Sequence, residues 1–260
     1  MRHNIKIFYL FARLSFKTIF QGRFGAWLFL AGKLLRFAFF IVFISVLFGK
    51  TKLIKGYSLE QVIIFFLTYN LIDTIAQALF REVYRFRPLV LFGGFDLVLT
   101  KPYHPFLRIL LGGIDFLDIF LIIPYGALII FFASKIPNLH PLSSILYLLF
   151  IFNSILIATA FHIAVLALGI MTTNVDHMIL IYRDLTALGR FPIDIYRSPL
   201  REIFTYILPV AVIMTFPGKA LFGLLNPFFI VWSFLVSLLL CFLSLRLWNF
   251  ALKKYQSYGG

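Results

Sequence analysis

Five stretches of this sequence are each long and apolar enough to cross a lipid bilayer as a helix. A membrane-spanning helix needs roughly 20 mostly apolar residues, because each residue advances the helix by only about 1.5 Å. Hydrophobic residues make up 62% of the 260 residues and charged residues only 13%, so too little polar surface remains to cover a soluble domain. The sequence therefore predicts an integral membrane protein, with spans at 24–48, 59–80, 109–133, 142–170 and 227–247.

A sixth and shorter apolar stretch, 202–216, decides how often the chain crosses, and Pro209 interrupts it. Lys and Arg collect on the cytoplasmic side of membrane proteins. If this stretch crosses and both termini are cytoplasmic, 17 Lys and Arg residues lie inside and five outside; if it does not cross, the numbers are 15 and seven. The distribution favours six spans with both termini inside. The five outer residues are then Lys50, Lys52, Lys55, Lys135 and Lys219, and the inner loop before the fifth span holds Arg183, Arg190, Arg197 and Arg201.

These spans define an all-α membrane protein in three parts. Residues 1–23 are predicted to form an amphipathic interfacial helix, 24–250 the six-helix membrane domain, and 251–260 a cytoplasmic tail. In the first part, basic and apolar residues fall on opposite helix faces, which suits a helix lying on anionic headgroups. The alternative is that this helix simply extends the first span. The basic face includes Lys6, Arg13 and Lys17, and the apolar face includes Phe8, Phe11 and Ala12.

The sequence contains no pattern typical of a catalytic, metal or nucleotide site. Gly49-Lys50-Thr51 looks like the end of a phosphate-binding loop, but Ile44 stands where that loop needs its first glycine. The five histidines lack metal-ligand spacing, and the single cysteine, Cys241, excludes an intrachain disulfide and a cysteine-based zinc site. We therefore expect no catalytic residue, metal or cofactor on this chain. The net charge of +14 indicates membrane topology rather than nucleic-acid binding.

Five ionisable residues fall inside the predicted spans: Lys33, Arg36, Asp73, Asp115 and Asp118. A charge at the bilayer centre costs about 2.5–3.5 kcal/mol on insertion scales, so such residues face other helices or water. Asp115 and Asp118 are three apart and share a helix face, as do Lys33 and Arg36. One hypothesis is that these residues form ion pairs that lock the first three spans together. The alternatives are that Lys33 and Arg36 reach the inner headgroups, or that the charges line the path of a polar or cationic substrate.

The loop between the second and third spans carries a short apolar segment in a basic setting. Gly93 and Gly94 break the chain, 95–100 reads as a short amphipathic helix, and Pro102 follows it. Such a helix is suited to docking in a groove of a partner, and the alternative is a simple re-entry turn. The predicted anchors are Phe95 with Leu97 or Leu99, and Asp96 is predicted to meet a basic residue or to cap the helix.

A series of aromatic and proline residues follows the fourth span. In order, these are Phe191-Pro192, Tyr196, Leu200-Arg201, Leu208-Pro209-Val210 and Phe216-Pro217. Together with the string FDLVL at 95–99 and Lys101-Pro102, this series resembles the permeases of type-2 ABC (ATP-binding cassette) transporters. The six-span layout and the basic N-terminal helix agree with this family over nearly the whole chain, whereas the motifs cover only two segments.

The resemblance implies the permease subunit of an ABC exporter in the bacterial plasma (inner) membrane. A second permease subunit, in a homodimer or a heterodimer, would complete a substrate path lined by spans one, two and five, and a separate ATPase subunit would bind the ATP. The stretch 216–226 would re-enter the outer leaflet before the last span. The residues implied to couple the permease to the ATPase are Gly93, Gly94, Phe95, Asp96, Leu97 and Leu99, and the family-motif positions are Phe191, Pro192, Tyr196, Arg201, Pro209 and Pro217.

Two further points concern the energy source and the cargo. A secondary transporter, or another polytopic membrane protein not driven by ATP, is the alternative, although the inverted repeats common in secondary transporters are not visible in this sequence. Aromatic residues make up 19% of the chain, which suits a hydrophobic or amphipathic substrate.

Overall fold

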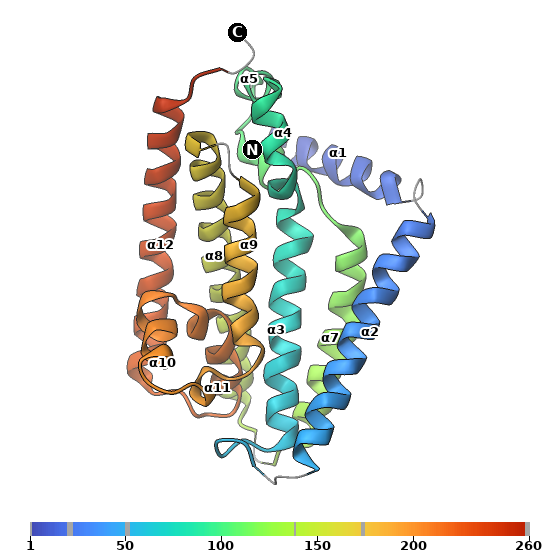
Figure 1. The fold of residues 1–260 in the computed structure, drawn as a ribbon, viewed down its shortest axis with the longest axis vertical. Coiled ribbons are helices and arrows are strands. Elements are labelled where there is room, and N and C mark those ends of the chain that lie inside the picture. Colours follow the sequence, from blue (N-terminus) through green and yellow to red (C-terminus); the bar gives the residue numbers. More distant parts are fainter. Residues whose placement is uncertain (1, 20–22, 50–52, 138, 173–174, 258–260) are drawn as a thin grey trace.

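The long helices of this chain run side by side, and one amphipathic helix lies across one end of the bundle (Figure 1). The computed structural model describes residues 2–19, 23–49, 53–137, 139–172 and 175–257, and this part of the chain contains no β-strand. We call the end of the bundle that carries α5 and residues 255–257 the terminal end. The opposite end, which carries residues 53–58 and 223–226, is the distal end. The all-α fold class is confirmed.

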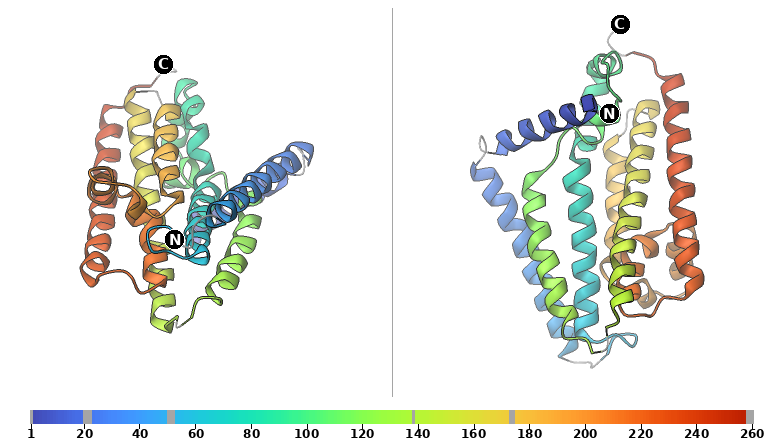
Figure 2. Two further views of the ribbon diagram at one scale, coloured as in Figure 1. Left: turned by 60° about the horizontal axis from the view of Figure 1, so that its bottom comes forward. Right: turned by 180° about the vertical axis from the view of Figure 1, so that it is seen from behind.

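The helices follow one another as an alternating series of passes between the two ends (Figures 1 and 2). Five helices, including α3 with its extension to Leu91, are long and apolar enough to span a membrane: α2, α3, α7, α8 and α12. The elements are α1 Arg2–Ile19, α2 Arg23–Phe48, α3 Leu59–Phe80, η2 Arg81–Arg85, α4 Phe86–Leu91, α5 Gly94–Leu99, α6 Phe106–Ile109, α7 Phe116–Ala133, α8 Pro141–Thr172, α9 Val175–Ala187, η3 Leu188–Arg190, η4 Ile193–Ile195, α10 Leu200–Glu202, η5 Ile203–Ile207, η6 Ala211–Thr215, α11 Phe216–Leu221 and α12 Pro227–Lys254.

The N-terminal helix α1 is a separate element that turns away from α2 (Figure 1), so the alternative that it extends the first span is wrong. It rests on the chain between α5 and α7. Phe11 packs edge-on against Tyr103 (6.3 Å between ring centroids), and Phe16 packs against Phe116 (5.2 Å). The side chains of Lys6, Arg13 and Lys17 are exposed, as the amphipathic pattern predicts. Residues 1 and 20–22 of this predicted part lie outside the described residues.

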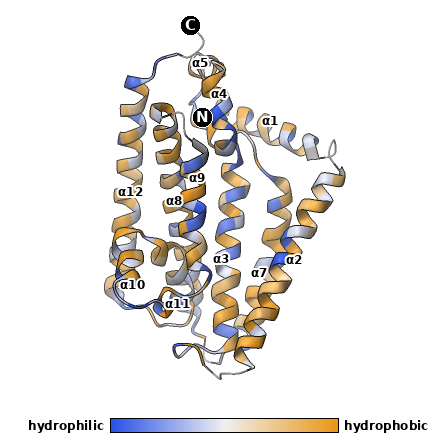
Figure 3. Cartoon of the chain, viewed as in Figure 1, coloured by the Kyte–Doolittle hydropathy of each residue, from blue (hydrophilic) through white to orange (hydrophobic). Residues whose placement is uncertain are grey.

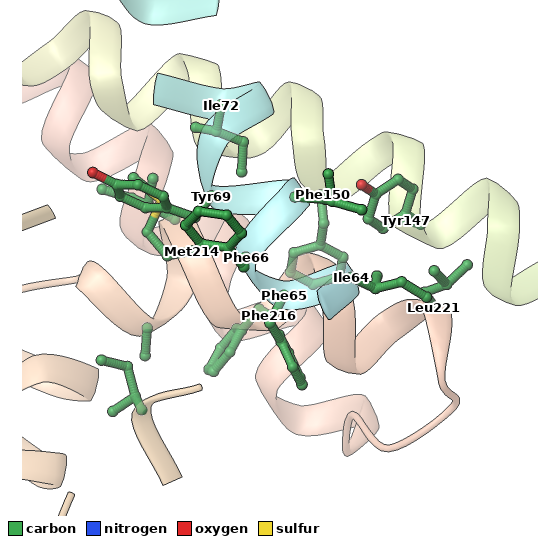
Figure 4. Close-up of a cluster of buried hydrophobic side chains, with 14 of the residues drawn as sticks. Ile64, Phe65, Phe66, Tyr69, Ile72, Tyr147, Phe150, Met214, Phe216 and Leu221 are labelled. Carbon is green, nitrogen blue, oxygen red and sulfur yellow. The ribbon is translucent and has the colours of Figure 1, made fainter. Parts of the chain in front are cut away.

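Helix α3 lies at the centre of the bundle and is buried along most of its length. It begins with a capping box: the Ser58 hydroxyl accepts a hydrogen bond from the Gln61 amide, and the Gln61 side chain accepts one from the Ser58 amide. Its bounds agree with the predicted second span. The distal half of α3 contributes Phe65 and Tyr69 to one buried cluster (Figure 4), and its terminal end contributes Phe80 to a second cluster.

The third span begins later than predicted, at Phe116 instead of residue 109. Two consecutive glycines, Gly112 and Gly113, separate α6 from α7, because glycine disfavours a continuous helix. Asp115 then serves as the N-cap of α7 and accepts a hydrogen bond from the Leu117 amide (3.0 Å). The extent of the last span also differs, because α12 continues to Lys254 and takes up part of the predicted tail; residues 258–260 lie outside the described part.

The fifth pass is made by a segment that the charge count assigned to an inner loop. Helix α9 packs against α8, and its residue Tyr182 belongs to the buried cluster at the terminal end. Ile193 already belongs to the buried cluster that contains Phe65 and Tyr69 in the distal half of the bundle. Tyr57, which lies between α2 and α3 at the distal end, donates a hydrogen bond to Asp194 (2.8 Å). The prediction that this segment stays at the end of the termini is therefore wrong. Hydropathy missed the pass because α9 is short and carries Arg183 and Asp184.

The predicted fifth span, 202–216, is a bent pair of helices in the distal half instead of a straight crossing. Leu200–Ile207 and Ala211–Leu221 meet at 85°. Pro209 stands at the break, where its missing N–H and its ring prevent the helix from continuing. Gly218 lets the second helix approach α3, since a Cβ there would lie 2.5 Å from the Phe65 ring. A re-entrant type of segment thus precedes the last helix, but it covers 200–221 rather than 216–226.

This topology predicts that residues 101 and 197 face opposite sides of the membrane. The chain has one cysteine, Cys241, so Cys241→Ser gives a cysteine-free background. Both Lys101 and Arg197 are exposed. A membrane-impermeant maleimide should label Arg197→Cys and Lys101→Cys from opposite sides, and Lys135→Cys from the same side as Arg197→Cys. Labelling of Arg197→Cys and Lys101→Cys from one side would restore the loop that the charge count predicted.

Candidate functional site

A buried ion pair joins α2 to α7 inside the bundle. The Lys33 ammonium pairs with the Asp118 carboxylate, whose side chain is completely buried. Lys33 also lies 4.6 Å from the centroid of the Phe29 ring and 3.5 Å from the Gln77 side-chain oxygen of α3. Lys33 therefore points into the bundle, which contradicts the alternative that it reaches for the headgroups. A charge in hydrocarbon is tolerated only when it is paired or hydrated, so this pair fixes α2 onto α3 and α7.

The other predicted charges are held differently from one another. Asp115 lies 3.6 Å from the Arg81 guanidinium, and because it precedes α7 it does not share a helix face with Asp118. Asp73 accepts a hydrogen bond from the side-chain amide of Gln77 (2.7 Å). Arg36 is exposed, and no ion pair within the described part of the chain reaches it. The five residues thus lie on the same three elements but do not form one ion-paired layer.

A stripe of side chains on α3 faces α2 and the end of η3. The stripe consists of Phe66, Tyr69, Asp73 and Gln77, spaced at helical intervals of three and four. Phe66 stacks on Phe40 of α2 with ring centroids 3.8 Å apart, and Phe40 also contacts Phe191 at 5.3 Å. Figure 3 shows hydrophilic turns within the otherwise hydrophobic helices α2, α3 and α9. We call this region, with Lys33, Arg36, Tyr69, Asp73, Gln77, Asp118 and Arg190, the polar seam.

The short helix α5 forms as predicted at the terminal end, but its residues point differently from the prediction. Gly93 precedes it with a φ of 69°, a left-handed conformation that glycine adopts without strain. Phe95 is completely buried and packs against Phe86 (5.3 Å) and Tyr255 (5.1 Å). Phe95 is thus part of the protein's own core, so the prediction that it fills a partner's groove is wrong. The apolar side chains that face outwards are Phe92 (85% exposed), Leu97 (66% exposed) and Leu99.

The polar residue of α5 contacts the C-terminal segment. Asp96 accepts a hydrogen bond from the Ser257 hydroxyl (2.6 Å). No side chain caps the N-terminus of α5, so the predicted capping role of Asp96 is wrong. Tyr255 and Ser257 together hold residues 255–257 against α5. The terminal end therefore presents one assembled surface made of α4, α5 and the end of the chain.

The family-motif residues lie around the bent pair, where they shape the distal segment. Tyr196 donates a hydrogen bond to the Leu188 carbonyl (2.9 Å), Arg201 pairs with Glu202 (2.8 Å), and Pro217 stands in the first turn of α11. Phe191 contacts α2, and Pro192 follows it directly before η4. Pro209 marks the bend. These residues therefore build structure in the distal half and do not line a loop at the terminal end.

An ion pair that the sequence analysis missed closes the distal segment. Lys219 lies 2.8 Å from Asp194, which also accepts the hydrogen bond from Tyr57. Burial, and after it the hydrogen bond to the Asp194 carboxylate, raises the pKa of Tyr57 above its usual value, so the hydroxyl remains a donor at neutral pH. A cavity of about 320 Å³ lies beside this pair, with Arg201 in its wall. The nearly buried Glu82, paired with Arg108, was missed as well.

The described residues contain no group of three or more His, Cys, Asp or Glu side chains that could hold a metal ion. The fold is that of a helical membrane protein with exposed apolar side chains around α5 at one end and a polar seam inside it. Residues 34–259 match the family model of the ABC-2 family transporter protein, so the chain belongs to this family. It is therefore a membrane permease component of an ABC transporter. Searches of curated proteins and of solved structures found no match.

The ion pair between Lys33 and Asp118 predicts a specific pattern of folding defects. Asp118→Ala should lower the folded yield and the melting temperature, because the Lys33 charge loses its partner at a cost of about 3–5 kcal/mol. The double variant Lys33→Met/Asp118→Leu should recover most of this loss, since it removes both charges. Fluorescence-detected gel filtration after heating measures both quantities.

The matched control for this experiment is Asp184→Ala, which removes an exposed carboxylate from α9. It should leave the yield and the melting temperature unchanged. A double variant no more stable than Asp118→Ala would show that the two charges do not stabilise each other.

Proposed function

We propose that this chain is the permease subunit of an ABC exporter, driven by a separate ATPase subunit that docks at the terminal end. The observation that carries the proposal is the exposure of three apolar side chains in and just before α5, namely Phe92, Leu97 and Leu99. Water is a poor environment for such side chains, and a groove on a partner is a good one. The family match supports the energy source, because an ABC transporter hydrolyses ATP on its own ATPase component.

The orientation follows from the distribution of basic residues. When the fifth pass is assigned to α9, thirteen of the 22 Lys and Arg residues in the described part of the chain flank the terminal end and five flank the distal end, while Lys33, Arg36, Arg183 and Arg190 lie within the bundle. The excess of basic residues favours a cytoplasmic terminal end, although the margin is smaller than for the predicted topology. Both termini and α5 then face the cytoplasm, and the membrane is the bacterial plasma (inner) membrane.

A second permease subunit accounts for the exposure of α2. This helix is exposed along most of its length, and Arg36 stands exposed at its midpoint. An arginine in contact with lipid tails at this depth costs about 2.5–3.5 kcal/mol on insertion scales. A second subunit that faces α2 across a hydrated path removes this cost. The path then runs between the two subunits along α2, α3 and α9, which are the predicted spans one and two and the corrected span five.

Alternating access follows from how α5 is attached. ATP binding closes the ATPase dimer and displaces its groove, and α5 moves with the groove. Phe95 links α5 to Phe86 of α4 and to Trp248 of α12, so the displacement reaches the helices that surround the path. The permease thus converts closure of the ATPase into a change in which side of the membrane the path faces.

The docking surface predicts different outcomes for two neighbouring phenylalanines. Phe92→Ala and Leu97→Ala should release the ATPase in a pull-down without lowering the yield of folded permease, because truncating an interface anchor commonly costs about 2 kcal/mol, or roughly thirtyfold in affinity. Phe95→Ala should instead lower the folded yield, because truncating a buried phenylalanine costs about 3–5 kcal/mol.

Phe228→Ala is the control, since Phe228 is an exposed phenylalanine at the distal end. It should change neither the yield nor the amount of ATPase retained. If Phe92→Ala and Leu97→Ala both retain the ATPase and support transport at the normal rate, α5 is not the coupling element.

A further inference from the structure

One guanidinium group lies over a tyrosine halfway along the bundle, and a second arginine stands at the midpoint of a neighbouring helix. Tyr69 stands at the midpoint of α3, and Arg36 stands at the midpoint of α2. The Arg190 guanidinium lies 5.6 Å from the centroid of the Tyr69 ring. On either side of Arg36, Phe37 packs against Phe66 (5.7 Å between ring centroids) and Lys33 lies 3.5 Å from the Gln77 side-chain oxygen, so this part of α2 runs along the part of α3 that carries Tyr69 and Asp73. Both arginines therefore lie at the depth where a charge is most costly in a membrane.

The polar seam around these residues is short of one negative charge. It holds the cations Lys33, Arg36 and Arg190 and the carboxylates Asp73 and Asp118. The Asp118 carboxylate is already paired with Lys33, and the Asp73 carboxylate accepts a hydrogen bond from the Gln77 side chain. Within the described part of the chain, no ion pair reaches Arg36 or Arg190. Since a net charge in a low-dielectric region is costly, the seam attracts an anion.

The surroundings of the two arginines are aromatic. The ring of Phe66 lies 5.7 Å from that of Phe37 and 3.8 Å from that of Phe40. Phe191, the neighbour of Arg190, touches Phe40. The wall next to the charges is thus apolar, and it lies one helical turn from Arg36, on the distal side. A ligand that suits both the arginines and the aromatic wall has an anionic head and an apolar chain.

We propose that Arg36 and Arg190 bind the anionic head group of the transported molecule, and that this molecule is an anionic amphiphile such as an alkyl phosphate or a fatty carboxylate. Guanidinium groups suit this task because they stay charged and bind phosphate or carboxylate oxygens in a bidentate way. The proposal rests on the proposed transport function and names the substrate class of the same path. It replaces the expectation of a cationic substrate, since the cations of the seam outnumber its carboxylates.

Binding can be measured on the permease–ATPase complex in phosphatidylcholine nanodiscs by isothermal titration calorimetry. The probes are dodecyl phosphate, dodecyltrimethylammonium, which has the same chain and the opposite charge, and inorganic phosphate, which has no chain. Dodecyl phosphate should bind at least tenfold more tightly than the other two. Arg36→Gln and Arg190→Gln should each weaken its binding about tenfold or more, and Arg36→Glu should reverse the preference between the two dodecyl probes.

The matched control is Arg246→Gln, which makes the same change at an exposed arginine of α12. It should bind dodecyl phosphate as the unchanged protein does. Arg36 is exposed, so its variants are expected to fold, and Arg190→Lys keeps the charge if Arg190→Gln lowers the yield. Equal affinity for the two dodecyl probes, or unchanged affinity in both Gln variants, overturns the proposal.

A resident anionic lipid has the same chemistry as an anionic substrate, and ATP hydrolysis separates the two sources. A transported amphiphile should stimulate ATP hydrolysis by the complex, and this stimulation should disappear in Arg36→Gln. Binding of dodecyl phosphate without stimulation assigns the site to a structural lipid and overturns the substrate proposal. Failure of the permease to retain any ATPase in a pull-down contradicts the proposed function instead, and binding to the permease alone remains measurable in that case.

Discussion

The packing of α3 among the other spans is the interaction on which the rest of the structure depends. At membrane depth every backbone polar group must be satisfied within the protein, and a helix satisfies these groups within its own segment. Its distal half packs against the bent pair and α8, with Phe65 closely opposed to Gly218. Its other end joins Phe86 and Phe95 in the second cluster. The side chains of Asp73 and Gln77 are only partly buried, and Gln77 meets Lys33 of α2 on this side of α3.

The sequence predicts the elements whose outer surface is apolar, because lipid and protein interior both favour apolar side chains. The start of the second span is predicted correctly at Leu59, since the capping residues Ser58 and Gln61 coincide with the start of its apolar run. The fifth pass could not be found in this way. Hydropathy treats a buried helix that bends within the protein, such as 200–221, like a straight span. It also treats α9 as a loop, because this helix is short and carries Arg183 and Asp184.

The charges of the candidate site were visible in the sequence, but their partners depend on tertiary geometry. Asp118 rather than Asp115 meets Lys33, because Gly112 and Gly113 delay the start of α7 and turn Asp115 into a cap. The exposed phenylalanine is Phe92 rather than Phe95 for a similar reason. The positive φ of Gly93 reverses the chain between α4 and α5, so two nearby phenylalanines face opposite environments. The left-handed conformation of Gly93 thus decides which phenylalanine faces outwards, and the sequence pattern alone does not show this.

The uneven attachment of the helices indicates which part of the bundle yields when α5 is displaced. α5 is joined to α4 and α12 through the buried rings of Phe86, Phe95 and Trp248, and α12 packs along α8. These elements therefore move as one body, because a close-packed core transmits displacement instead of absorbing it. α2 is exposed along most of its length and is held by the ion pair of Lys33 and by the aromatic contacts of Phe37 and Phe40. The polar seam lies between the rigid body and this lightly held helix, so a displacement at the terminal end changes the geometry of the seam before it disturbs the core.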